Sequence, residues 1–283
     1  MESEEYLAYR RDWERLPQDH IVSDFPLHVD IELTNRCNLQ CDRCMFHSSD
    51  APFPPETEED MDFKIFKKVI DEGSKKRLKA IKLNYRGEPL LYPQLKEVIS
   101  YAKHAGILDV QLNTNAILLS KQKSKELIIA GLDLLIVTDY DFPPQIRNTK
   151  FLHDVREIHG KQTPMIRVQT DKPERWNKIA DEIVKPIYYD YHNIKEVFEK
   201  SEFKCSYPWL RFLVMVNGDI MMCSCGTVYH DKYLGNIKDW ELESLWHSRR
   251  MKFLRICHEH RCTELVRICR LCPMRNDWIE RNK

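Results

Sequence analysis

Six short apolar segments alternate with helix-like segments between residues 28 and 189. The segments expected to form strands are 28–33, 79–84, 109–113, 133–138, 165–169 and 186–189. Asp62 and Ser120 are placed to cap two of the intervening helices, and Gly73 and Gly131 are expected to end them. A further helix is expected at 174–184. This alternation predicts a parallel β/α sheet, and six units are too few for a closed eightfold barrel.

Three cysteines follow the first predicted strand. Cys37, Cys41 and Cys44 have the spacing C-x3-C-x2-C, in a loop that leaves the segment 28–33. Such a loop can fold three thiolates onto one centre and still leave a polynuclear metal cluster short of a fourth protein ligand. A zinc site is the alternative, although structural zinc takes a closed set of four ligands. The spacing therefore favours a cluster with one position open to another molecule.

Charge and cysteine usage narrow the class of protein. The chain has 44 basic and 44 acidic residues, so no overall field favours nucleic acid. It begins with no apolar segment and has none of transmembrane length, so we expect a cytoplasmic protein without membrane contact. Cytosolic thiols stay reduced, which disfavours disulfides among the ten cysteines. Three of them fall at 37–44 and seven at 205–272, which fits two groups of metal ligands.

Two further motifs stand at the ends of later strands. Gly87, Glu88 and Pro89 follow the second predicted strand, and Asn113 and Asn115 lie at the end of the third. Each motif alone also suits an ordinary turn or loop. In this order, each after a strand, the cysteine loop and the two motifs resemble the radical S-adenosylmethionine (SAM) enzymes. The resemblance implies that Gly-Glu-Pro receives the SAM ammonium and that the asparagines approach its ribose.

The same resemblance implies the fold and the first cofactors. The fold would be α/β, a partial (β/α)6 TIM barrel, with a [4Fe-4S] cluster on Cys37, Cys41 and Cys44. SAM would bind the fourth iron through its amino and carboxyl groups. Many relatives carry an aromatic residue before the third cysteine, where this chain has Arg43. Packing against the adenine is therefore expected to fall to another residue, and Phe46 is the candidate.

A second cysteine group lies in the C-terminal part. Segments 211–216 and 219–222 are predicted strands joined by Asn217 and Gly218, a two-residue hairpin signal, and a helix is expected at 240–254. The cysteine spacing resembles the auxiliary-cluster region of SPASM and Twitch proteins, and the shorter Twitch form matches better. A zinc ribbon is the alternative. The resemblance implies a second [4Fe-4S] cluster with four ligands: Cys205, Cys223, Cys269 and Cys272.

Three cysteines have no assigned place in either cluster. Cys257 and Cys262 are interpreted as ordinary free thiols. For Cys225 three roles stay open, namely a bystander, a substitute ligand, or a hydrogen-atom donor to a substrate radical. The units expected along the chain are an N-terminal extension at 1–26, the partial barrel at 27–200 and the auxiliary domain at 201–283.

The resemblance extends to a class of reaction. Over about residues 28–275 the chain is similar to the aminocyclitol dehydrogenases, such as the 2-deoxy-scyllo-inosamine dehydrogenases. This implies hydrogen abstraction from a C–H of an aminocyclitol, aminoglycoside or sugar and two-electron oxidation of a carbinol. A flavodoxin or ferredoxin would be the reductant. Three alternatives stay open: a radical epimerase with Cys225 as hydrogen donor, a ribosomal-peptide-modifying enzyme, and an iron–sulfur electron carrier or sensor. The peptide class usually has an N-terminal recognition domain, for which the residues before the first strand are too few.

Later strand ends supply the candidate substrate residues. Asp139 and Asp141 form a carboxylate pair suited to an ammonium group, and Gln169 ends the fifth strand. For each candidate the alternative is a polar group that lines a loop or the barrel without a catalytic part. The candidates to take a hydroxyl proton are Arg167, Tyr191 and His192.

Overall fold

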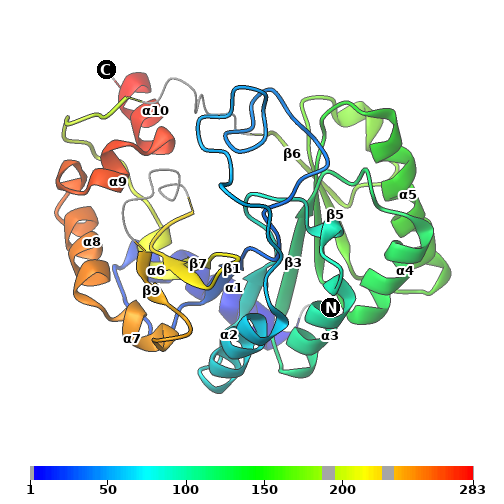
Figure 1. Cartoon of the computed structure of the whole chain (residues 1–283), viewed down its shortest axis with the longest axis horizontal. Helices are drawn as coiled ribbons and strands as arrows, with labels where there is room; N and C mark the ends of the chain where they lie inside the picture. The colour runs from blue at the N-terminus through cyan, green and yellow to red at the C-terminus, as the bar shows by residue number, and fades with distance from the viewer. Residues whose placement is uncertain (1–2, 187–194, 225–232, 283) are drawn as a thin grey trace.

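One mixed β-sheet organises the chain in the computed structural model, which describes residues 3–186, 195–224 and 233–282 (Figure 1). Across the sheet the strand order is β6-β5-β4-β3-β2-β1-β7-β8-β9, with β6 and β9 at its edges. Neighbours from β6 to β7 pair in parallel, whereas β8 and β9 pair antiparallel. The open parallel part confirms the predicted α/β class. The strands are β1 (His28–Ile31), β2 (Ala80–Lys82), β3 (Asp109–Thr114), β4 (Leu134–Thr138), β5 (Met165–Gln169), β6 (Glu182–Val184), β7 (Arg211–Val214), β8 (Asp219–Met221) and β9 (Tyr233–Asn236).

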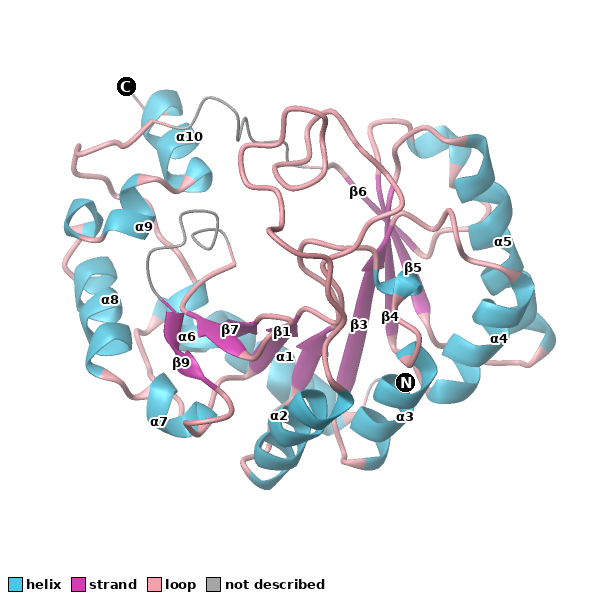
Figure 2. Cartoon of the chain, in the orientation of Figure 1, coloured by secondary structure: helices cyan, strands magenta, loops and turns pink. Residues whose placement is uncertain are grey.

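Helices lie outside the parallel strands and beyond the hairpin (Figure 2). Helices α2 to α5 alternate with β1 to β5 along the chain, so the carboxyl ends of these strands meet at one edge of the sheet. The described helices are α1 (Glu4–Gln18), α2 (Phe63–Lys75), α3 (Leu95–His104), α4 (Lys121–Ala130), α5 (Pro143–Ile158), α6 (Tyr207–Leu210), α7 (Leu242–Trp246), α8 (Arg249–Glu259), α9 (Arg267–Arg270) and α10 (Pro273–Arg281).

Helix α1 covers the opposite edge, where the strands begin. Its buried residues Tyr9 and Leu16 pack against Leu27, Ala80 and Leu210, which stand at the amino ends of β1, β2 and β7. The amino ends are therefore closed, and the carboxyl ends remain for a site. Among the described residues, no helix combines the length and apolar character that a membrane crossing requires.

Helix caps appear where the sequence predicts them. The Asp62 carboxylate accepts a hydrogen bond from Lys64 N at 2.8 Å, and Ser120 Oγ accepts one from Lys123 N at 3.1 Å. Gly131 ends α4 in the left-handed conformation, with φ of 90°. Such a backbone favours glycine because a side chain is crowded there. These three local predictions are confirmed.

Gly73 has another role than the predicted one. Helix α2 continues past it to Lys75, so the prediction that Gly73 ends the helix is wrong. Gly73 is buried, and a Cβ at this position would lie 2.7 Å from Leu78 Cδ2. The glycine lets the segment after the helix pack closely against its last turn.

The predicted helix at 174–184 is also wrong. This segment begins with a single 3-10 turn, Pro173–Arg175, and ends as strand β6. The carboxylate of Asp181 accepts a hydrogen bond from Ile166 N at 2.7 Å, which holds the chain beside β5 in an extended form. The sixth strand thus comes earlier than the predicted 186–189, of which the residues after 186 lie outside the described part.

The C-terminal unit continues the same sheet through β7. The predicted hairpin between β7 and β8 is confirmed, but its loop has three residues rather than two, because Met215 N donates to Asp219 O at 2.8 Å. Gly218 takes the left-handed position with φ of 93°. The predicted helix at 240–254 is in fact two helices, α7 and α8. Ser248 breaks it, since its Oγ caps α8 by accepting from Met251 N at 3.4 Å.

Candidate active site

The carboxyl ends of the parallel strands open into a cavity of about 630 Å³, a size usual for small-molecule sites. The three motifs predicted from the sequence all reach this cavity. Lys185 and Pro186, after β6, close its far side. The motif residues that line it are Cys37, Cys41, Cys44, Phe46, Gly87, Glu88, Asn113 and Asn115.

The cysteine loop is anchored at its start by the connector that follows it. Asn35 Nδ2 donates to Thr57 O at 2.8 Å, and Asn35 Oδ1 accepts from Glu59 N at 2.7 Å. The Arg36 guanidinium pairs with Asp60 at 2.6 Å. In Figure 1 this blue segment lies at the top, between the C-terminal helices and β6. The backbone before the first cysteine is therefore fixed independently of any metal.

The thiols of the loop are close enough to influence one another. Burial and the nearby Cys44 thiol raise the pKa of Cys37 and of Cys41 to about 11. Metal coordination reverses this balance, because a coordinating thiol loses its proton outright. No three His, Cys, Asp or Glu side chains within 3–186, 195–224 and 233–282 lie close enough to hold a single metal ion. The donor set, three thiols around an open cavity, suits an iron–sulfur cluster with one iron left for another ligand.

Gly87 brings the second motif against the cysteine loop. A Cβ on this residue would lie 2.4 Å from Thr34 O and 2.5 Å from Arg36 O, so only glycine fits. The next residue, Glu88, donates its backbone N–H to Arg36 O at 2.8 Å. Close backbone packing thus sets the position of the loop that holds Cys37.

Glu88 joins the second motif to the third. Its carboxylate, 3% exposed, accepts from Leu90 N at 3.0 Å, from Thr114 Oγ1 at 2.6 Å and from Asn115 N at 2.8 Å. Burial raises the pKa of Glu88, while these donors oppose the rise. A contact between Glu88 and a SAM ammonium stays a prediction; the carboxylate already has three donors from the chain.

Two asparagines leave acceptors free for a ligand. Asn84 lies two residues beyond β2, Asn113 lies in the neighbouring strand β3, and both line the cavity. Each Oδ1 is buried without a hydrogen-bond partner among the described residues. Asn115 differs, since its Nδ2 donates to Asn38 Oδ1 at 2.9 Å and ties the third motif to the cysteine loop. Buried acceptors without donors are costly, so this wall fits a ligand with hydroxyl or amino groups, such as SAM.

Aromatic side chains form another wall of the cavity. Phe46, predicted to pack against adenine, is 7% exposed and meets the Tyr85 ring edge-on, with centroids 5.4 Å apart. Tyr140, which the sequence analysis did not select, also lines the cavity. Tyr140 keeps 42% of its surface exposed, and contact of its ring with the cavity wall together with the three nearby thiols raises its pKa. Tyr140 is the second residue after the predicted strand 133–138, and this position at a strand end is the sequence feature that could have indicated a place in the site.

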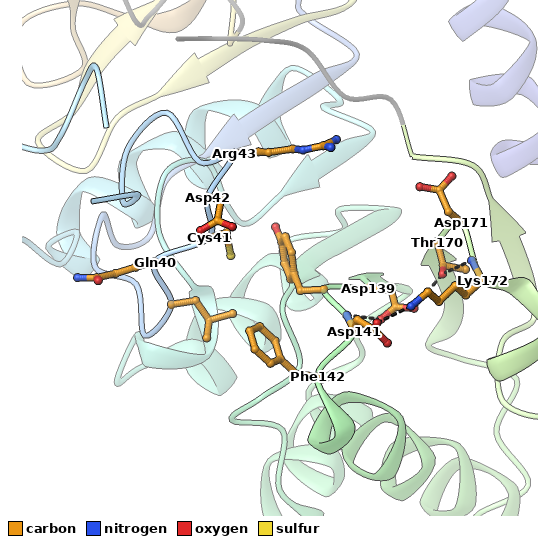
Figure 3. Close-up of a pocket in the computed structure, with 12 residues that line it drawn as sticks. Gln40, Cys41, Asp42, Arg43, Asp139, Asp141, Phe142, Thr170, Asp171 and Lys172 are labelled. Carbon is orange, nitrogen blue, oxygen red and sulfur yellow. Dashed lines mark hydrogen bonds and ion pairs between the residues drawn. The ribbon is translucent and has the colours of Figure 1, made fainter. Parts of the chain in front are cut away.

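A second cavity of about 470 Å³ adjoins the first (Figure 3). Both predicted substrate carboxylates line it, but both bind partners from the chain. Asp139 accepts from Thr170 Oγ1 and from Trp176 Nε1, each at 2.8 Å. Asp141 pairs with Lys172 and with Arg175, the last residue of the 3-10 turn Pro173–Arg175. An ammonium-binding role for the two aspartates stays a prediction.

The remaining predicted substrate residues are dispersed. Gln169 lines the larger cavity, and its Oε1 accepts from Thr138 Oγ1 at 3.0 Å. Arg167 does not line that cavity, and its Nε donates to Glu182 Oε2 at 2.7 Å. Three predicted residues lie outside the described part of the chain: Tyr191, His192 and Cys225.

The four predicted auxiliary ligands meet at one small cavity in the C-terminal unit. Its volume is about 20 Å³, and its other walls are mainly apolar. Burial raises the pKa of Cys205 and Cys269, and that of Cys272 to about 11. His258 Nε2 lies 3.4 Å from Cys269 Sγ. Four thiols without a carboxylate among the lining residues suit an iron–sulfur cluster that the protein encloses completely. The lining cysteines are Cys205, Cys223, Cys269 and Cys272.

Cys257 and Cys262 lie beside each other rather than in that cavity. Cys257 is 1% exposed, and burial together with the hydrogen-bonded Cys262 raises its pKa to about 12. Neither lines the four-cysteine cavity.

A buried ion pair links the first site to the hairpin. Glu32, fully buried, accepts from Arg86 Nε at 2.6 Å and Nη2 at 2.7 Å. The same carboxylate accepts from Val216 N at 3.1 Å. No local sequence pattern predicts this link, because Glu32 is 54 residues from Arg86 and 184 residues from Val216.

Replacing Glu32 by glutamine is expected to destabilise the chain by about 3 kcal/mol, since it leaves the Arg86 charge buried without its counter-ion. Urea denaturation of the two proteins measures the difference. The matched control, Asp12→Asn, breaks an exposed pair with Arg15 and should cost less than about 1 kcal/mol. Equal losses for the two variants would contradict a buried, structural pair.

The fold and both sites define an open, mainly parallel β/α sheet with one open three-thiol pocket and one enclosed four-thiol pocket. The chain belongs to the Radical SAM superfamily, whose model matches residues 31–185, more than half of its length. The model of SPASM, described as an iron-sulfur cluster-binding domain, matches residues 205–273. Family membership implies a [4Fe-4S] cluster and SAM at the first pocket and iron–sulfur binding at the second.

Three proteins that match most of this chain do so at low sequence identity. The antilisterial bacteriocin subtilosin biosynthesis protein AlbA of Bacillus subtilis is 22% identical over 84% of this chain and 65% of its own length. This chain thus spans less than two thirds of AlbA. Among solved structures, BtrN in complex with AdoMet and 2-DOIA has a TM-score of 0.65 at 17% identity, covering 89% of this chain and 94% of BtrN. Streptococcus suis SuiB bound to SAM has a TM-score of 0.60 at 15% identity, covering 95% of this chain and 77% of SuiB. At such identities these structures support the fold alone.

Proposed function

We propose that this chain is a radical SAM oxidoreductase that oxidises a carbinol of a small polar substrate, an aminocyclitol, aminoglycoside or sugar. When bound, SAM and the first cluster supply a 5′-deoxyadenosyl radical that takes a hydrogen atom, and the second cluster accepts one electron. The hydroxyl proton goes to a base of the protein. One electron, from a proposed flavodoxin or ferredoxin, would be used to cleave SAM. The products would be methionine, 5′-deoxyadenosine, the ketone, one proton and one electron returned through the second cluster.

The contrast between the two pockets carries this proposal. The first holds three thiols beside about 630 Å³ of space lined by polar strand ends, enough for SAM and a small substrate. The second brings four thiols together among mainly apolar side chains, so each iron of a cluster there would have a protein ligand and none would be open to a substrate. A cluster held there by protein on every side is suited to electron transfer rather than to substrate binding. The substrate would lie in the first pocket.

The chain offers polar groups for the substrate and for its proton. The free Oδ1 atoms of Asn84 and Asn113 can accept from hydroxyl or ammonium groups of a ligand. We keep Tyr191 and His192 as candidates for the base. Arg167 is a weaker candidate, since it pairs with Glu182 away from the cavity. Tyr140 lies beside the cysteines, and its neutral phenol could donate a hydrogen bond to the substrate.

Isotope labelling tests the reaction. The reconstituted protein, with dithionite, SAM and a panel of aminocyclitols in deuterated water, is expected to yield a ketone that has lost two hydrogen atoms and carries no solvent deuterium at the reacting carbon. An isomer of the substrate that carries one deuterium on carbon would instead establish a radical epimerase, provided that Cys225→Ala abolishes its formation.

Peptide modification is the second candidate, favoured by the cavity that adjoins the first. Together the two cavities form a longer site, with Leu39 and Arg43 at their shared wall. AlbA is a bacteriocin biosynthesis protein, and one solved structure is of SuiB bound to the precursor peptide SuiA. Substrate-dependent formation of 5′-deoxyadenosine with short peptides, and none with aminocyclitols, would favour this function.

A further inference from the structure

The loop of the second motif touches both halves of the molecule. Tyr85 lies three residues beyond β2, between Asn84 and Arg86, and Gly87 follows Arg86. Its Oη donates a hydrogen bond to Ser224 O at 2.9 Å, although the two residues are 139 positions apart. Ser224 directly follows Cys223, one of the four cysteines of the enclosed pocket. The Tyr85 side chain therefore connects the loop of the second motif (Gly87, Glu88 and Pro89) to the backbone beside the four-cysteine pocket.

The ring of Tyr85 also forms part of the cavity wall. It lines the 630 Å³ cavity and a neighbouring one of about 270 Å³, which Met215 and Val216 of the hairpin also line. Phe46 meets the ring edge-on from the cysteine-loop side. The phenol thus stands between the open pocket and the hairpin that leads to Cys223.

The neighbouring residue makes the connection rigid. Arg86 and Val216 N both donate to the buried carboxylate of Glu32, so the loop and the hairpin share one acceptor at the end of β1. Because Arg86 is bound to Glu32 and the Tyr85 hydroxyl is bound to Ser224 O, Tyr85 has little freedom to move relative to either pocket. A movement of one pocket would have to carry the other with it.

We propose that Tyr85 is a positioning residue that sets the Cys223 side of the auxiliary cluster relative to the substrate pocket. Its phenol orients the Ser224 carbonyl, and backbone dipoles and hydrogen bonds near cluster sulfurs tune the reduction potential. This inference rests on the proposed function, because it matters most where an electron leaves the substrate for the second cluster. It explains why a tyrosine of the SAM motif makes its hydrogen bond to a distant loop.

Tyr85→Phe tests the inference, because it keeps the ring against Phe46 and removes only the hydroxyl. The matched control is Tyr92→Phe, since Tyr92 Oη makes an equal bond to Met61 O at 2.9 Å, in the core. Both changes are made in a chain that carries alanine at Cys37, Cys41 and Cys44, so that electron paramagnetic resonance observes the auxiliary cluster alone. Tyr85→Phe is expected to shift the midpoint potential of that cluster, and Tyr92→Phe is not.

A second readout uses the complete enzyme. Tyr85→Phe should raise the ratio of 5′-deoxyadenosine to oxidised product several-fold over the Tyr92→Phe protein, because hydrogen abstraction becomes uncoupled from electron removal. An unchanged potential, or an equal shift in both variants, would overturn the inference. If no substrate is oxidised by the unmodified enzyme, the proposed function fails, and the potential measurement still decides the role of Tyr85.

Discussion

Replacing Cys37 by alanine is expected to abolish formation of 5′-deoxyadenosine and to lower the iron content from about eight to about four atoms per chain. Cys37 is one of three thiols at the open pocket, and this part of the chain offers no fourth cysteine to replace it, since the next one along is Cys205. The auxiliary cluster should remain, because its four ligands lie in a separate cavity. Iron and sulfide analysis with a SAM-cleavage assay measures both effects.

Cys262→Ala is the control for this change. Cys262 is also partly buried, but it lines neither cysteine pocket. Its replacement should leave iron content and SAM cleavage as in the unmodified protein. If Cys262→Ala lost as much iron as Cys37→Ala, the assignment of ligands to the two pockets would be wrong.

Gly87→Ala is expected to lower SAM cleavage by about a hundredfold, an effect typical of a misplaced catalytic loop. The added Cβ would overlap Thr34 O and Arg36 O, and neither backbone atom can move without shifting the loop that begins at Cys37. Single-turnover formation of 5′-deoxyadenosine measures the loss, with iron content determined on the same sample.

The control for general destabilisation is Gly106→Ala. Gly106 has a left-handed backbone, with φ of 88°, but a Cβ there meets nothing within 4 Å, in contrast to Gly87. Ala at this position should cost about 1 kcal/mol of folding free energy and leave SAM cleavage intact. Full activity of Gly87→Ala would show that close packing of the motif on the cysteine loop is not required.

Much of the site could be predicted because its signals are local in sequence. The three thiols of the first loop lie within eight residues, and Gly87 and Glu88 are adjacent. Asp62 and Ser120 cap helices through bonds to residues two and three positions on. Patterns of this kind depend on short stretches of chain, so they can be recognised without knowledge of the fold.

Other features depend on contacts between distant segments. Tyr140 reaches the cysteines only because β4 ends beside the pocket, and the Tyr85 link to Ser224 joins residues far apart in sequence. The helix predicted at 174–184 failed for the same reason. A hydrogen bond from β5 to Asp181 holds that segment extended, against its local helical pattern.

Strands of one sheet lead to both pockets, and no local sequence pattern predicts this arrangement. Strand β7 pairs in parallel with β1. The hairpin that leads to Cys223 therefore belongs to the same sheet as β1, whose following loop holds Cys37. Glu32 sits at this junction and binds groups from both sides. The auxiliary pocket is therefore held at a fixed place relative to the open one.

Anaerobic incubation of the reconstituted protein with SAM and dithionite tests the central claim most directly. We expect 5′-deoxyadenosine and methionine in equal amounts, with about eight iron atoms per chain and no cleavage after Cys37→Ala. A fully loaded protein that forms no 5′-deoxyadenosine under these conditions would contradict it and would leave an iron–sulfur electron carrier as the better description.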